Sequence, residues 1–295
     1  MTEYRSIFKG FREQILDIDG INIRIRHGGS GPPLLLLHGN PQTLCMWHAV
    51  AERLAGRFTV VAADLRGYGD SGKPATAADH APYSKRAMAA DQVAVMRQLG
   101  YPEFFVAGHD RGGRVAYRMA FDHPACVKKL AVLDIVPTLA AFNRADAEFA
   151  LGYYHWFFLA QPFDLPERLI GADPEYFWRR HTTRGRTDMF APEALEDYLR
   201  CFRDPATIHG ICEDYRAAAS IDREHDRADL GHRKIGCPVL ALWGQKGKLD
   251  RWYDVLAVWR DWADDVRGRS LACGHYLAEE MPEETAAELG RFFAG

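Results

Sequence analysis

The chain has 295 residues, of which 47% are hydrophobic and 26% charged, and its formal net charge at pH 7 is −3. These values exclude a disordered chain, and the absence of a strong positive charge argues against a nucleic-acid or membrane surface as the partner. No segment has the roughly 20 apolar residues of a membrane span, and the first residues lack the apolar core of a signal peptide. We therefore expect a cytoplasmic protein with neither a nucleic-acid nor a membrane partner.

The first elements expected along the chain are two antiparallel strands. Residues Gln14–His27 alternate apolar and polar side chains around an Asp19-Gly20 turn, which is typical of a hairpin. Further along, short apolar runs alternate with helical patterns, which predicts an α/β fold with buried parallel strands and helices on both faces of the sheet. These runs are Pro33–Leu37, Phe58–Ala63, Phe104–Ala107, Leu130–Leu133 and Val239–Trp243.

The strand rhythm stops near Pro137 and resumes at Cys237. Between them, aromatic residues are dense and prolines separate short helical stretches, which predicts a helical insertion. We expect a core domain of residues 1–137 and 231–295 and a helical cap of residues 138–230. An insertion beyond the carboxyl end of a strand lies where open α/β sheets bind ligands.

The motif with the clearest chemical meaning lies within residues 104–120. This segment passes from a buried strand through GHDRG (108–112) into an amphipathic helix and has the form G-x-D-x-G. In a nucleophile elbow, flanking glycines allow a tight strand-to-helix turn that exposes the central side chain at the helix N-terminus. The pattern predicts Asp110 as a nucleophile, with capping of the helix as the alternative role.

Two further segments fit such an elbow. The sequence HGNP (38–41) follows an apolar run, at the position from which the backbone N–H of Asn40 can form an oxyanion hole with that of Arg111. His275 follows the last strand of the core, where hydrolases of this layout place their catalytic histidine. We therefore predict His275 as the general base.

The chain order nucleophile, acid, histidine requires a carboxylate between Asp110 and His275. Asp134 ends the apolar run at 130–133, whereas Asp250 lies in the loop after the run at 239–243. A strand-end acid is fixed by the sheet, so we favour Asp134 and keep Asp250 as the alternative.

An aspartate nucleophile restricts the reaction. Attack on an ester carbonyl would give an anhydride, whereas attack on a saturated carbon gives an ester that water can hydrolyse. The leaving group is then an epoxide oxygen, which needs an acidic hydroxyl, or a halide, which needs N–H or O–H donors. Tyr153, Tyr154 and Tyr215 are candidates for the first role and His155 and Trp156 for the second, with packing inside the insertion as the alternative for all five.

Arg111 and Arg114 favour an anionic substrate. They lie three residues apart at the start of a helix and so share a face beside Asp110. Two like charges about 4 Å apart cost on the order of 4 kcal/mol at an effective dielectric near 20, and two guanidinium groups can offset this repulsion while binding a carboxylate through parallel hydrogen bonds. A surface ion pair is the alternative for Arg114, and we expect Arg118 on the same helix to be exposed.

At these residues the chain resembles the haloacetate dehalogenases, including the fluoroacetate dehalogenases, of the α/β-hydrolase superfamily. The resemblance spans nearly the whole chain, and GHDRGGR (108–114) and YHWFFLAQP (154–162) are its most specific segments. The other segments are HGNPQ with Trp47, DLRGYGDS (64–71), LDIVPT (133–138), DYRAAASIDREHD (214–226) and GHYLAEE (274–280).

The resemblance implies an α/β-hydrolase fold with an inserted helical cap, no metal or organic cofactor, and a homodimer. It also implies the site residues. These are Asp110 as nucleophile, His275 as base, Asp134 as its partner, Arg111 and Arg114 for the substrate carboxylate, and His155 and Trp156 for the halide.

Two departures from this family concern the halide. Asn40 stands where phenylalanine is usual and resembles an asparagine of the haloalkane dehalogenases that donates to the halide, so it is a further halide-binding candidate. Some fluoroacetate-active members have a tyrosine near the positions of Ala219 and Ser220, and this stretch contains none. Defluorination is therefore less well supported than dechlorination.

The expected activity is hydrolysis of short 2-haloacids, such as chloroacetate or fluoroacetate to glycolate and halide, through an aspartyl ester. The alternatives are an epoxide hydrolase with the same Asp-His-Asp machinery and a non-catalytic hydrolase-like protein that binds a small molecule.

Overall fold

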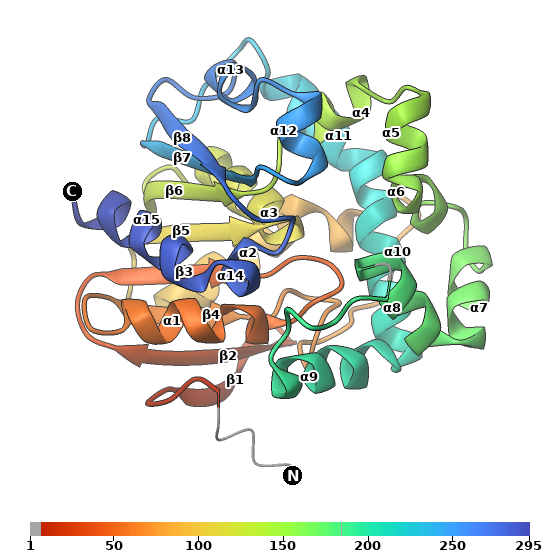
Figure 1. The fold of residues 1–295 in the computed structure, drawn as a ribbon, viewed down its shortest axis with the longest axis horizontal. Helices are drawn as coiled ribbons and strands as arrows, with labels where there is room; N and C mark the ends of the chain where they lie inside the picture. Colours follow the sequence, from red (N-terminus) through yellow and green to blue (C-terminus); the bar gives the residue numbers. More distant parts are fainter. Residues whose placement is uncertain (1–6, 184) are drawn as a thin grey trace.

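The computed structural model describes residues 7–183 and 185–295, and an eight-stranded sheet forms the centre of this part of the chain (Figure 1). The strand order is β1-β2-β4-β3-β5-β6-β7-β8. β2 is antiparallel to both β1 and β4, and every neighbouring pair from β4 to β8 is parallel. The strands are β1 Arg12–Ile18, β2 Ile21–Gly29, β3 Pro33–Leu37, β4 Thr59–Ala63, β5 Phe104–His109, β6 Val127–Leu133, β7 Val239–Gly244 and β8 Val266–Leu271.

The apolar runs of the sequence become the buried central strands, so the predicted α/β fold is confirmed. The predicted hairpin is also present, with Asp19 and Gly20 at positive φ values of 50° and 83° in its turn. The apolar runs do not predict β8, because this edge strand alternates the exposed side chains of Arg267 and Arg269 with partly buried neighbours.

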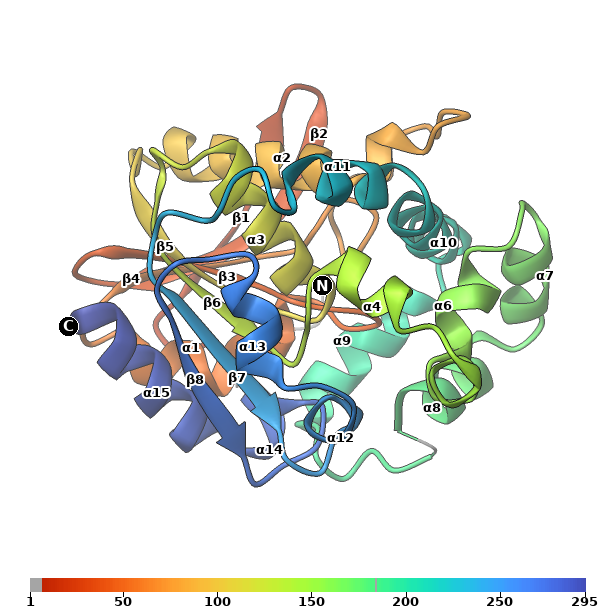
Figure 2. The same ribbon diagram turned by 90° about the horizontal axis from the view of Figure 1, so that it is seen from above.

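Helices cover both faces of the sheet. α1 and α15 pack on one face, and α2 and α3 pack together on the other (Figure 2). None of the helices in the described residues has both the length and the apolar character that crossing a membrane requires. The helices of this part are α1 His48–Leu54, α2 Lys85–Gln98, α3 Arg111–Asp122, α12 Lys248–Trp252, α13 Val255–Arg260, α14 Leu277–Glu280 and α15 Pro282–Ala294, with short 3-10 turns at Leu44–Trp47 and Ala81–Tyr83.

Helices α4 to α11 follow β6 and precede β7, and we call this segment the lid. It lies beyond the carboxyl ends of the parallel strands, on the right-hand side of Figure 1. Ligands of open α/β sheets bind at this edge, so the lid covers the expected site. Its helices are α4 Thr138–Asn143, α5 Ala147–Gly152, α6 Tyr154–Leu159, α7 Leu165–Ala172, α8 Pro174–Thr183, α9 Pro192–Phe202, α10 Pro205–Ala219 and α11 Ile221–Asp229.

Candidate active site

Asp110 lies at a sharp turn between β5 and α3. Its backbone has φ 47° and ψ −115°, a conformation that L-residues rarely adopt. The turn needs glycines on both sides, because a Cβ on Gly108 would lie 2.3 Å from the carbonyl oxygen of Gly112, and a Cβ on Gly112 would lie 2.4 Å from that of Leu37. This backbone is the elbow that the G-x-D-x-G pattern predicts, and it presents the Asp110 side chain at the start of α3.

The chain brings His275 and Asp134 to the same edge of the sheet. Asp134 directly follows β6, and its Oδ2 lies 2.5 Å from His275 Nδ1. The backbone N–H of Gly244 donates to the other oxygen of Asp134 at 2.9 Å, which fixes the carboxylate. His275 Nε2 lies 4.0 Å from Asp110 Oδ2. The three predicted side chains therefore form one continuous row.

The alternative acid, Asp250, lies elsewhere. It is exposed and accepts a hydrogen bond from Trp243 Nε1 at 2.6 Å. The carboxylate that contacts His275 Nδ1 is that of Asp134.

The charges of this row shift the pKa of its members in opposite directions. Burial favours the neutral form of Asp110, but the nearby His275, His109, Arg111 and Arg114 side chains hold its pKa below the usual value. For His275, burial lowers the pKa, but the hydrogen bond and charge of Asp134, together with the charge of Asp110, raise it overall. Asp110 is therefore ionised at neutral pH, as a nucleophile must be.

A backbone N–H group binds the Asp110 carboxylate. The N–H of Asn40 donates to Asp110 Oδ1 at 2.9 Å. The N–H of Arg111 belongs to the first turn of α3, where helical geometry provides no acceptor. Gly39 allows this close approach, since a Cβ there would lie 2.4 Å from Asp110 Cβ.

A cavity of about 350 Å³ opens above Asp110, between the sheet and the lid. The lid supplies most of its aromatic wall, and the segments that follow β3, β5, β6, β7 and β8 supply the rest of its lining. The predicted site residues that line it are Asn40, Asp110, Arg114, Asp134, His155, Trp156 and His275.

The two predicted halide donors lie next to a third polar side chain from the lid. The ring of Tyr215, on α10, lies 5.8 Å from that of His155 and 6.2 Å from that of Trp156. Asn40 Nδ2 donates to Tyr215 Oη at 3.3 Å. The stretch near Ala219 and Ser220 contains no tyrosine, but Tyr215, earlier on α10, lines the cavity.

The two arginines beside Asp110 are both buried, but they are held differently. Arg111 is bound along one edge by Asp214, whereas Arg114 Nη1 donates to the carbonyl of Val136 at 3.0 Å and to Thr138 Oγ1 at 3.1 Å. Arg114 lines the cavity, and Arg111 lies behind its surface. The surface ion pair considered for Arg114 is therefore wrong.

Arg118 is not exposed, contrary to the expectation from its place on the helix. It is 1% exposed and forms a buried ion pair with Asp229 of the lid. The lid packs on this face of α3, so the Arg118 side chain is buried in the interface between α3 and the lid.

His181 of α8 also lines the cavity, although no motif identifies it. Its ring lies 4.5 Å from that of His155 and stacks on Phe177. Burial lowers the pKa of His181 to about 4, and burial together with the neighbouring His181 lowers the pKa of His155 well below its usual value. Both rings are therefore neutral near pH 7 and can act as N–H donors.

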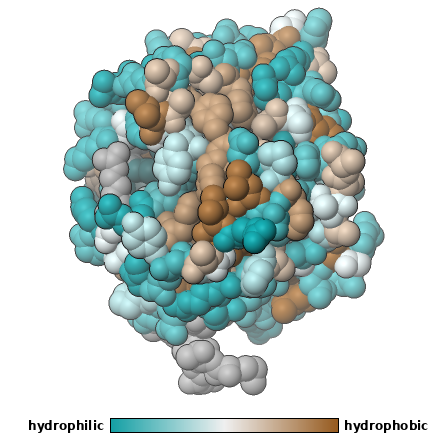
Figure 3. Space-filling view, turned by 90° about the vertical axis from the view of Figure 1, so that its right-hand side faces the viewer, coloured by the Kyte–Doolittle hydropathy of each residue, from teal (hydrophilic) through white to brown (hydrophobic). Residues whose placement is uncertain are grey.

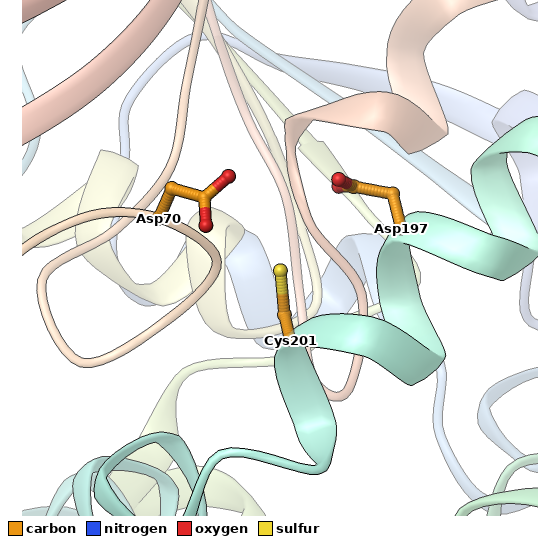
Figure 4. Close-up of side chains that lie close together, drawn as sticks. All are labelled: Asp70, Asp197 and Cys201. Carbon is orange, nitrogen blue, oxygen red and sulfur yellow. The ribbon is translucent and has the colours of Figure 1, made fainter. Parts of the chain in front are cut away.

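Among the described residues, one group has the composition of a metal site, namely Asp70, Asp197 and Cys201 (Figure 4). Two arginines already neutralise its carboxylates. Arg24 Nη1 lies 3.2 Å from both Asp70 and Asp197, and Arg200 Nη2 lies 2.7 Å and 2.8 Å from the same two residues. This arrangement is an ion-pair cluster that attaches α9 to the core.

Similarity to known proteins identifies the family of this chain. A family model described as the alpha/beta hydrolase fold matches residues 32–282. A fluoroacetate dehalogenase from Burkholderia sp is 48% identical over 98% of this chain and 95% of its own length, and a soluble epoxide hydrolase from Corynebacterium sp. (strain C12) is 35% identical over 94% and 95%. A solved structure from Nostoc sp PCC 7120, described as an α/β hydrolase, is 57% identical to this chain and has a TM-score of 0.95. The match covers 97% of this chain and 99% of the chain in that structure. The chain therefore belongs to the α/β-hydrolase family and, within it, to the haloacetate dehalogenases.

Proposed function

We propose that the protein hydrolyses short 2-haloacids, such as chloroacetate and fluoroacetate, to the 2-hydroxyacid and halide. The observation that carries this proposal is an ionised aspartate at the elbow, Asp110, with two buried arginines beside it. A carboxylate substrate requires such cations near an anionic nucleophile. The identity to a fluoroacetate dehalogenase supports the same reaction, and the epoxide hydrolase is a more distant relative.

In the first step, Asp110 Oδ2 attacks the carbon that bears the halogen. The C–O bond of an aspartyl ester forms, the carbon–halogen bond breaks, and the halide leaves with the bonding electrons. Oδ1 already accepts the N–H of Asn40, so Oδ1 becomes the ester carbonyl oxygen and Oδ2 the ester oxygen. Arg111 and Arg114 hold the substrate carboxylate so that its α-carbon lies in line for attack.

In the second step, water attacks the ester carbonyl carbon of Asp110. His275 Nε2 takes the proton of this water, and Asp134 stabilises the imidazolium through its 2.5 Å hydrogen bond. The negative charge that develops on Oδ1 is stabilised by the N–H groups of Asn40 and Arg111. The bond between the ester carbonyl carbon and the ester oxygen then breaks, and His275 returns the proton to the 2-hydroxyacid.

The departing halide is stabilised by the donors of the cavity wall. His155 and Trp156, on α6, supply N–H groups, and Tyr215, on α10, supplies an O–H group. Asn40 donates to Tyr215 Oη, which leaves the hydroxyl proton of Tyr215 for another acceptor. Asn40 contributes to halide binding through this contact as well as through its second amide hydrogen.

Ion-selective measurement of chloride and fluoride released from the two haloacetates tests the proposal. We expect release of both ions by the wild-type protein and none by Asp110→Asn. Absence of release from both acids would remove the proposed activity.

Epoxide hydrolysis is the second candidate, because Tyr153 and Tyr215 line the cavity and an epoxide hydrolase is 35% identical. It would need a tyrosine proton and would not need Arg114. Turnover of styrene oxide that survives Arg114→Leu and is lost in Tyr215→Phe would favour it. A non-catalytic binding protein would instead bind its ligand equally well after Asp110→Asn.

We further propose that the lid is a separate cap domain and that the protein acts as a cytoplasmic homodimer. Hydrophobic side chains gather on this side of the molecule (Figure 3). The exposed large side chains of the lid include Phe163, 69% exposed, and Tyr176, 63% exposed. Burial of such a patch against a second copy would remove it from water. All six cysteines lie in described positions and are free thiols, in accordance with a reducing compartment. Light scattering after size exclusion should give twice the chain mass of 33.3 kDa.

A further inference from the structure

A lid aspartate holds one of the two substrate arginines. Asp214, on α10, accepts hydrogen bonds from Arg111 Nε at 2.8 Å and from Arg111 Nη2 at 2.6 Å, and its backbone carbonyl accepts a further one from Nη2 at 3.0 Å. Both side chains are completely buried. The two parallel bonds fix the plane of the guanidinium group.

Asp214 is itself held by two residues of the core. Tyr68 Oη donates to its Oδ2 at 2.6 Å, and Lys85 Nζ bonds its Oδ1. Lys85 also lies 3.3 Å from Asp222, whose other oxygen accepts the backbone N–H of Lys85 at 2.8 Å. Two carboxylates therefore face two cations, Arg111 and Lys85, and the cluster has no net charge.

This arrangement leaves one nitrogen of Arg111 without a partner. Arg111 Nη1 is buried and makes no hydrogen bond, and Arg114 Nε is in the same state. Buried donors without partners are rare in folded proteins and call for an explanation. Arg114 lines the cavity that holds Asp110, and Arg111 lies directly behind this wall.

Arg114 is held by neutral groups alone. Its Nη1 donates to the carbonyl of Val136 and to Thr138 Oγ1. Thr138 Oγ1 is hydrogen-bonded to Tyr117 Oη, which is in turn hydrogen-bonded to the carboxylate of Asp226. Burial and the neighbouring Arg111 lower the pKa of Arg114, whereas Asp214 raises that of Arg111 against the effect of burial. Arg114 therefore has no carboxylate as a hydrogen-bond partner, and the charge of the nearby Asp110 raises its pKa against these effects.

We propose that Asp214 is a positioning residue for the dehalogenation reaction. It orients Arg111 so that Nη1 meets the substrate carboxylate together with Arg114. This inference rests on the proposed function and gives Asp214, the first residue of the segment at 214–226, a role in substrate binding.

The lid offers a matched control for Asp214. Asp229, on α11, forms an ion pair with Arg118, which lies one turn beyond Arg114 on α3. Asp229 is also buried and also joins the lid to α3, but its partner Arg118 lies two helical turns from Asp110, whereas Arg111 directly follows Asp110. A loss of lid attachment alone would therefore appear in both variants.

The experiment compares Asp214→Asn with Asp229→Asn. For chloroacetate we expect Asp214→Asn to raise KM about tenfold or more with a smaller change in kcat, because Arg111 loses its orientation before it binds the carboxylate. Asp229→Asn should lower the melting temperature without changing KM. Chloroacetamide, which has no carboxylate, should react with both variants as it does with the wild type.

Tyr68→Phe keeps the test available if Asp214→Asn does not fold. It removes one hydrogen bond to Asp214 and should raise KM for chloroacetate about threefold with little loss of stability. An equal rise of KM in the Asp214 and Asp229 variants, or an equal loss with chloroacetamide, would overturn the inference, as would an unchanged KM in Tyr68→Phe.

Calorimetry with acetate separates this inference from the proposed function. If the wild type released no halide, the proposed function would fail, but acetate binding that is lost in Asp214→Asn and kept in Asp229→Asn would still support positioning of Arg111. Equal binding of acetate by both variants would reject it.

Discussion

Replacing Asp134 by asparagine should separate the two chemical steps. Asp134 accepts two hydrogen bonds, from Gly244 N at 2.9 Å and from His275 Nδ1 at 2.5 Å. An asparagine that keeps its carbonyl on Gly244 turns its NH2 group toward Nδ1. His275 must then carry its proton on Nε2, the nitrogen that faces Asp110, and it cannot accept a proton from water.

The second step should therefore slow by about 10⁴-fold, the effect of the same change in Ser-His-Asp hydrolases, which corresponds to roughly 5 kcal/mol. The first step needs no base, so halide release should occur once per active site at nearly the wild-type rate. Rapid-quench measurements with chloroacetate should show this burst of chloride, slow formation of glycolate, and a protein mass increased by one carboxymethyl group.

Asp250→Asn provides the control, since Asp250 accepts its hydrogen bond from Trp243 and should leave both steps intact. The reasoning would be refuted if Asp134→Asn slowed chloride and glycolate equally without a burst. It would also be refuted if Asp250→Asn stalled the second step.

Three further predictions concern substrate charge, pH and the elbow. Arg114→Leu should lower kcat/KM for chloroacetate by about 10²–10³-fold, because the like-charge repulsion near Asp110 is on the order of 4 kcal/mol at an effective dielectric near 20. The same variant should turn over chloroacetamide as the wild type does, and equal losses for both substrates would contradict this prediction. The hydrolysis step needs neutral His275, so its rate in single-turnover experiments should rise with pH through the pKa of His275 and then level off. That pKa should be lower in the ester intermediate than in the free enzyme, because the ester removes the charge of Asp110, which raises it; a rate that fell with increasing pH would exclude His275 as the base. Gly39→Ala would place a Cβ 2.4 Å from Asp110 Cβ and should lower kcat by about 100-fold or more. Circular dichroism should show that the variant is folded, and an unchanged kcat would show that the elbow tolerates displacement.

The fold could be predicted from the sequence for the strands that are buried on both faces. The runs at β3, β4 and β7 are apolar because both faces of these strands are covered, so their pattern identifies them. β8 lies at the sheet edge and carries exposed arginines, so the pattern fails there. The elbow was predictable because the backbone of Asp110 requires glycines at fixed spacing.

The rest of the site depends on how the lid docks. His181 lies on a lid helix, α8, and nothing in its local sequence indicates that it reaches the cavity. Arg118 has the spacing of an exposed helical residue, but Asp229 of the lid covers it. The same docking brings Asp214 against Arg111 across 103 positions of sequence. Such contacts follow from tertiary packing, which periodicity does not encode.

The most direct test of the mechanism follows the oxygen of water through a single turnover. With enzyme in excess over chloroacetate in H₂¹⁸O, we predict that the heavy isotope enters the Asp110 carboxylate and that the glycolate hydroxyl carries the original oxygen of Asp110. Mass spectrometry of the peptide that contains Asp110 and of the product gives both readings. Labelled glycolate together with an unlabelled Asp110 would show direct displacement by water and contradict the aspartyl ester.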